Sequence, residues 1–290
     1  MNPAELLELI SRRADHITSA VAATGNKLDF RDKEFCPRMD IIEDCGGAFL
    51  DLAADRATIW HATGQPLHHI FHVLLHLHRY WVEGVPQLWH KKHGCTGMLF
   101  DFESTYEHLV IIPAEIAHFR EAYSYWVGFA EEKLYQCQEQ ALSPAHFKTQ
   151  LFQLFLLTQT AFARSQVSDS ISEEAEKHGL KDEFSELASV IFKNYQHKAF
   201  VLESLCQYRT GCVPEYLGLR WIEQKKGGDG KQFFWASLRD YQRLGKQSGE
   251  PVSNDAERGG GNYRKNQMKP RQPTKLADVS TPRTRSERVF

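Results

Sequence analysis

The chain has 290 residues and a mass of 33.4 kDa, with 42% hydrophobic and 25% charged residues, which excludes a fully disordered chain and a collagen-like fibre. It has no apolar run of about 18 residues, and charges interrupt the N-terminal segment where a signal peptide needs an apolar core. We therefore expect a cytoplasmic protein with no membrane contact. The six cysteines form no C-x-x-C pair, which disfavours disulfides and a thiolate zinc site.

The net charge of −2 conceals an acidic body followed by a basic tail. Residues 224–290 contain 15 Lys/Arg and 7 Asp/Glu, whereas residues 1–223 contain 20 Lys/Arg and 30 Asp/Glu. After Leu244 the chain is poor in apolar residues and rich in glycine, so it cannot bury enough surface to fold. The segment 223–290 is predicted to be a largely disordered tail, from about residue 245 onward. Such a tail either binds nucleic acid or only solubilises the protein.

Hydrophobic periodicity predicts a chain made mostly of helices. The predicted helices cover residues 4–23, 67–84, 100–112, 114–132, 144–165, 170–178 and 181–207. Pro66 suits a first helical turn, Ser143 is a good N-cap before Pro144, and Gly179 separates the last two helices.

Two short runs, 48–52 and 57–62, are rich in strand-favouring residues around a charged bend and predict a β-hairpin. No strand–helix alternation or phosphate-binding loop is present. The expected fold class is mainly α (α+β). We divide the chain into an N-terminal helix (1–25), a small α+β domain (26–127), a helical domain (128–222) and the tail (223–290).

Ten of the fourteen histidines lie between His61 and His118. In the predicted helix after Pro66, His72 and His76 are one turn apart on one face, so both imidazoles can point at one cation, as in zinc peptidases. His68 and His72 have the same spacing, and the register remains open between the two pairs. The spacing predicts a zinc site, although imidazoles with a carboxylate also suit iron or nickel.

A third ligand must come from another element, and the predicted helix at 100–112 supplies candidates. Glu103 and Glu107 lie one turn apart on this helix, and His108 follows directly. We predict Glu103 as the third ligand, with Glu107, His108 and His69 as alternative ligands or bases. The competing interpretation is that the histidines are buried polar residues bonded to these carboxylates or to the backbone.

Three segments occur in order within residues 47–116: the hairpin sequence GAFLDLAADRATIWH, the segment HVLLH (72–76), and an acidic helix that runs into LVIIP (109–113). In these segments, which cover less than a third of the chain, the sequence resembles the minimal zincin domain of ImmA/IrrE-type metallopeptidases. This resemblance implies a strand pair before the metal-binding helix, a glutamate ligand on the next helix, a zinc cofactor, and a regulatory role in bacteria or mobile elements.

The sequence departs from this family at the catalytic base. Val73 stands where the HExxH motif has the glutamate that takes a proton from water, and in the alternative register that position is His69. Loss of a general base costs a factor of about 10²–10⁴ in rate. We therefore expect a degenerate metal-binding protein with a regulatory or recognition role. The alternatives are an active metallohydrolase with another base, and a helical adaptor that binds a protein or nucleic acid.

Overall fold

The computed structural model describes residues 3–23, 27–32, 34, 47–52, 54–90, 96–140, 142–163, 165–210, 216–224, 230–244 and 287–288. These ranges form a mainly helical protein with two small sheets, which confirms the predicted mainly α (α+β) class. None of the described helices is both long enough and apolar enough to cross a membrane.

The first sheet contains the predicted hairpin. Strands β2 (Gly47–Asp51) and β3 (Arg56–His61) pair antiparallel, and Asp55 adopts a positive φ of 47° in the turn between them. Two further strands extend this sheet: β1 (Lys27–Asp32) is parallel to β3, and β7 (Glu287–Arg288) pairs with β2, giving the order β1-β3-β2-β7. Strand β1 was not predicted, because Leu28 and Phe30 are its only apolar residues and their neighbours are charged.

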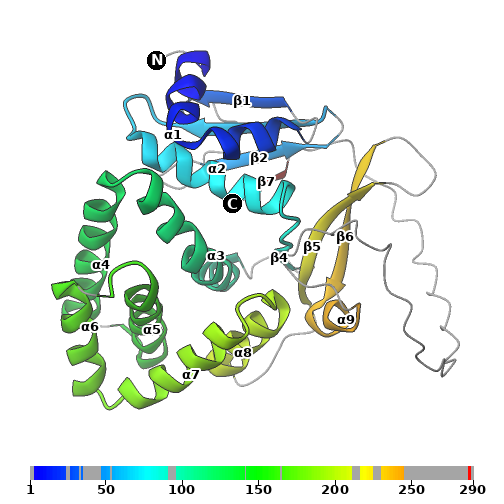
Figure 1. The fold of residues 1–290 in the computed structure, drawn as a ribbon. Helices are drawn as coiled ribbons and strands as arrows, with labels where there is room; N and C mark the ends of the chain where they lie inside the picture. Colours follow the sequence, from blue (N-terminus) through cyan, green and yellow to red (C-terminus); the bar gives the residue numbers. More distant parts are fainter. Residues whose placement is uncertain are drawn as a thin grey trace, which may run out of the picture.

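Two helices pack against this sheet and against each other (Figure 1). Helix α1 (Pro3–Ala23) buries Ile10, Ile17 and Val21 and is kinked at Ala14, which has non-helical backbone angles. Helix α2 (Leu67–Trp81) is the predicted histidine-rich helix, and the turn after it contains Gly84 with a φ of +68°. Most of α2 is buried, including the side chains of His68, His72 and His76.

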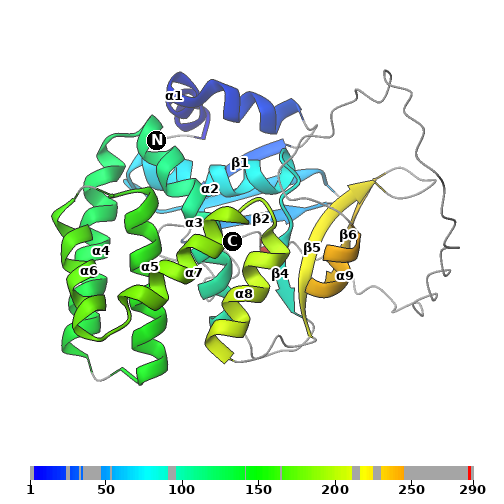
Figure 2. The ribbon, with the colours of Figure 1, turned by 60° about the horizontal axis from the view of Figure 1, so that its bottom comes forward.

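Six further helices follow the strand β4 (Gln87–His90) and form the largest part of the structure (Figure 2). They are α3 (Thr96–His118), α4 (Glu121–Glu139), α5 (Pro144–Thr160), α6 (Gln166–Lys177), α7 (Lys181–Lys193) and α8 (Lys198–Thr210). The predicted N-cap is confirmed, because the Ser143 side chain accepts a hydrogen bond from the backbone N–H of His146. Gly179, with a φ of +67°, lies between α6 and α7 as predicted.

The predicted helix end at Pro113 is wrong. Helix α3 continues through Pro113 to His118, and the chain turns at Phe119 and Arg120 before α4. A proline inside a helix removes one backbone hydrogen bond and crowds the preceding turn. Tertiary packing overrides this cost here, because Ile111, Ile112 and Glu115 on either side of the proline are each fully buried.

A second sheet, in the order β4-β5-β6, contains strands β5 (Leu217–Gln224) and β6 (Lys231–Ser237) and is followed by helix α9 (Leu238–Arg243). The predicted start of the tail at residue 223 therefore falls inside β5, and the structure continues to Leu244. The predicted boundary at 127/128 falls inside α4. Strand β4 comes from a distant part of the sequence, so local charge and glycine content could not reveal this sheet. Residues 245–286, 289 and 290 of the predicted tail lie outside the described residues.

We expect a chain ending at Leu244 to keep its fold. The described contact that this deletion removes is the pairing of Glu287 and Arg288 with β2, a ladder of two residue pairs. One hydrogen bond contributes a net of about 0.5–1.5 kcal/mol, so the melting temperature should fall by about 1–6 °C per lost bond. Differential scanning calorimetry of both chains tests this, and a fall of tens of degrees would contradict it.

Candidate metal centre

Three histidine side chains from two helices converge on one point inside the protein. His72 and His76 extend from one face of α2, and His108 extends from α3. The Nε2 atom of His72 lies 3.2 Å from Nε2 of His76 and 3.2 Å from Nε2 of His108. The ligand atoms of all three lie within 4.8 Å of one another. His72 and His76 are buried, and His108 is half-buried.

These separations suit a metal ion. In a tetrahedral zinc site with Zn–N bonds of about 2.0–2.1 Å, neighbouring nitrogens lie about 3.3–3.4 Å apart. The two measured separations of 3.2 Å are close to this edge length. Three imidazoles also form the protein part of known zinc sites in which water occupies the fourth position. The described residues therefore provide a ligand set that fits zinc.

Glu115 orients His72, the central residue of the three-histidine group. It lies two turns after His108 on α3 and is fully buried. Its Oε2 accepts hydrogen bonds from Nδ1 of His72 at 2.8 Å and from Nε1 of Trp126 at 2.9 Å, and its Oε1 accepts one from Nδ1 of His68 at 2.8 Å. Burial opposes ionisation of Glu115, but the hydrogen bonds from His68 and His72 lower its pKa to about 2. It is therefore a buried anion.

The protonation pattern leaves lone pairs facing the centre. Because Glu115 is an acceptor, a neutral His72 carries its proton on Nδ1, and its Nε2 then presents a lone pair. Nδ1 of His108 lies 3.0 Å from the Ser104 hydroxyl, which can hold that ring in the same tautomer. Burial and the neighbouring His72 lower the pKa of His108 to about 3, and the same two causes lower the pKa of His76 well below its usual value. Neutral imidazoles are the form that binds metals.

Glu103, predicted as the third ligand, does not belong to this group. Its Oε1 accepts from Nζ of Lys198 at 2.6 Å, and its Oε2 accepts from the backbone N–H of Leu88 at 2.9 Å. The structure brings His108, one of the predicted alternatives, to the third position instead. Glu103 and His108 are five residues apart and therefore lie on different faces of α3. The face with Glu103 meets Lys198, which lies 95 residues further along the chain.

The other two alternatives also lie outside the group. Glu107 accepts hydrogen bonds from Arg79 and Lys198 with its two oxygens. The ring of His69 packs against His68 and Tyr125, each at a centroid distance of 4.3 Å. Neither side chain is placed as a ligand or as a base at the three-histidine centre.

Glu115 and Trp126 were not predicted from the sequence to be parts of the site. The spacing of His108 and Glu115, seven residues, places both on one side of a helix, and this was a usable signal. The predicted break at Pro113 concealed it by assigning the two residues to different helices. Trp126 lies on α4, and its ring is 5.4 Å from that of His72 and 5.5 Å from that of His108.

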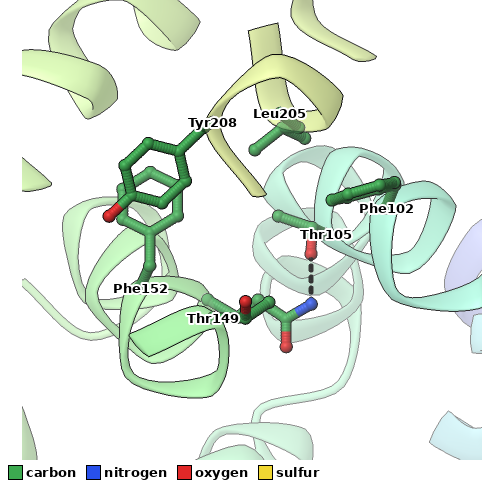
Figure 3. A pocket seen from close by; sticks show the side chains of 7 residues that line it. Phe102, Thr105, Thr149, Phe152, Leu205 and Tyr208 are labelled. Atoms are coloured by element: carbon green, nitrogen blue, oxygen red, sulfur yellow. Dashed lines mark hydrogen bonds between the residues drawn. The ribbon is translucent and has the colours of Figure 1, made fainter. Parts of the chain in front are cut away.

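Two hollows in the described residues lie away from the histidines. A cavity between α3, α5 and α8 is lined mainly by apolar groups, including Phe102, Phe152 and Leu205, and has a volume of about 10 Å³ (Figure 3). This space holds about one water molecule and no substrate. A groove of about 240 Å³ lies between α4 and α6, beside the exposed Tyr135.

Comparison with known proteins identifies no relative of this chain. No family model, curated protein or solved structure matches it at a significant level.

Proposed function

We propose that this protein binds one zinc ion through His72, His76 and His108, and that it is a zincin-like metal-binding protein without standard peptidase activity. The single observation that supports this most strongly is the approach of three Nε2 atoms, two of them 3.2 Å from the third, in a buried place. Because Nδ1 of His72 donates to Glu115, Nε2 of His72 presents a lone pair to the other two rings, and a cation between the three nitrogens would accept it. The buried charge of Glu115 adds to the attraction for a cation through His72.

The arrangement of elements supports the zincin-like part of the proposal. A strand pair precedes the helix with the HxxxH segment, and the third ligand comes from the next helix, as the resemblance to ImmA/IrrE-type metallopeptidases implies. The ligand set differs from that family, because His108 replaces the expected glutamate. The proposed site therefore follows the order of elements that the resemblance implies, but with a different third ligand.

The residues around the centre argue against the usual hydrolytic mechanism. Val73, next to the first ligand, has no proton acceptor. Glu115 is fully buried and already accepts three hydrogen bonds, and Glu107 is held by two cations. Neither carboxylate is therefore available as a general base, because each is hydrogen-bonded to other side chains. We propose a regulatory or recognition role for the protein. Imidazole ligands also bind iron and nickel, so these are the alternative metals.

Metal analysis of the purified chain tests this function. We expect about one zinc per chain by mass spectrometry, and a higher melting temperature with zinc than with a chelator, because a ligand that binds only the folded state stabilises it. Absence of any bound transition metal after incubation with zinc, iron and nickel would instead favour the helical adaptor. Zinc-dependent cleavage of casein or of a peptide library would favour the active hydrolase.

Glu115→Gln should weaken zinc binding while leaving all three ligands in place. The amide can still accept a hydrogen bond from His72 but no longer supplies a negative charge, and changes of such supporting groups typically cost about 10–100-fold in metal affinity. Competition with a chromophoric chelator measures the effect. Glu121→Gln is a control, because this carboxylate lies on the surface and pairs with Arg13. An unchanged affinity in Glu115→Gln would show that Glu115 does not support the metal.

A further inference from the structure

Four charged side chains lie beside the metal centre and connect three helices. Arg79 lies on α2, three residues after His76; Glu103 and Glu107 lie on α3; and Lys198 is the first residue of α8. We term these four residues the charge bridge. The side chain of Lys198 is 1% exposed and that of Glu107 is 2% exposed, so their charges depend on one another rather than on water.

Glu107 is the central member of the charge bridge. Its Oε2 accepts a hydrogen bond from Nε of Arg79 at 2.5 Å, and its Oε1 accepts one from Nζ of Lys198 at 2.6 Å. Lys198 donates a second bond, also of 2.6 Å, to Glu103. Burial opposes ionisation of Glu107, yet the charges of Arg79 and Lys198 lower its pKa to about 2. One carboxylate thus joins α2 to α3 and α3 to α8.

The charge bridge is next to the metal ligands on both helices. Glu107 directly precedes His108, so a rotation or shift of α3 that moves one side chain must move the other. The start of α8 makes further contacts with the same face of α3. The ammonium of Lys198 lies 5.0 Å from the ring centroid of Tyr106, and the Tyr106 hydroxyl donates to the carbonyl of Tyr195 at 2.5 Å.

The position of Lys198 within its own helix is unfavourable. The first turn of a helix carries a partial positive charge, which favours acidic residues and disfavours lysine. Burial of the ammonium adds a desolvation cost. The two carboxylates of α3 offset both costs. The contacts of Lys198 therefore indicate a role toward α3 rather than in α8 itself.

We infer that Lys198 is a positioning residue for the metal centre: through Glu107 it fixes the rotation of α3 that brings His108 to His72 and His76. The inference rests on the proposed zinc site. It implies that zinc binding and the packing of α8 against α3 are energetically coupled. Such coupling is reciprocal, so zinc must stabilise the packing of α8 by the same factor by which that packing raises the zinc affinity.

Hydrogen exchange of the unaltered full chain tests the coupling. We expect zinc to slow amide exchange in residues 198–210 by about fivefold or more, the lower end of typical coupling factors. Helix α6, which contributes no residue to the charge bridge, serves as the internal reference. The double variant His72→Ala/His76→Ala should show no such protection. Bound zinc with no change in the exchange of α8 would overturn the inference.

Zinc titrations of two Lys198 variants test the residue itself. Lys198→Met should weaken zinc binding about tenfold, toward the lower end of the range for supporting groups, and Lys198→Arg should restore most of the loss because it keeps the charge. Lys181→Met is the matched control, since that lysine begins α7 but pairs with Glu176 on the surface. In a Glu107→Gln background, Lys198→Met should have little further effect on zinc affinity, because Lys198 acts through Glu107.

The outcomes distinguish this inference from the proposed function. If the unaltered chain binds no metal, the proposed function fails and the inference fails with it. If the unaltered chain binds zinc and folded Lys198→Met binds it equally well, only the inference fails. Should Lys198→Met not fold, zinc is titrated into Glu103→Gln/Lys198→Met instead, which keeps the net charge of the charge bridge at zero. The exchange experiment on the unaltered chain then decides whether the inference holds.

Discussion

Replacing His72 with alanine should reduce the zinc affinity by roughly 10²–10⁴-fold. Structural zinc sites bind with about 10–16 kcal/mol, and one of three protein ligands contributes about a third of this, at about 1.4 kcal/mol for each factor of ten. Among the three proposed ligands, His72 is the one whose Nε2 lies 3.2 Å from Nε2 of both others. The substitution also removes the hydrogen bond between His72 and Glu115. Chelator competition, with zinc content as a second readout, measures the effect.

His69→Ala is the matched control for this variant. His69 lies on the same helix three residues earlier, and its ring packs against His68 and Tyr125 rather than at the centre. We expect its zinc content and affinity to equal those of the unaltered chain. If His72→Ala kept both stoichiometry and affinity, or if His69→Ala lost them, the three-histidine centre would be wrong.

Glu107→Gln should lower the free energy of unfolding by about 3–5 kcal/mol, the cost of removing one partner from a buried ion pair. The glutamine leaves the guanidinium of Arg79 and the ammonium of Lys198 buried without the charge that both of them contact. Chemical denaturation followed by circular dichroism measures the change. A chelator should be present in both samples, so that a change in metal binding does not enter the comparison.

Glu176→Gln is the control for the effect of burial. Glu176 also accepts a hydrogen bond from a lysine, Lys181, at 2.7 Å, but on the surface, where water screens the pair. Its variant should unfold at the same denaturant concentration as the unaltered chain. Equal behaviour of Glu107→Gln and Glu176→Gln would contradict a structural role for the charge bridge.

Local sequence signals predicted the structure best. The hairpin before α2, the cap at Ser143 and the break at Gly179 were all predicted from neighbouring residues, and the structure contains them. Strand β1 and the sheet of β4, β5 and β6 were missed, because their stability comes from partners far away in the sequence. The helix end at Pro113 was wrong because burial of the surrounding residues outweighs the local cost of proline.

Helix geometry alone places the imidazoles of His72 and His76 on one face, since four residues make about one helical turn. The sequence also limits the candidates for a third ligand to a few side chains of the following helix. Contacts between segments that are distant in the sequence determine which of these side chains lies beside His72 and His76. Lys198 holds both glutamates through charge, while Ser104 and Glu115 orient His108 and His72. The interaction between buried charges depends on their distance in the folded structure, and this distance cannot be read from the order of residues in the sequence.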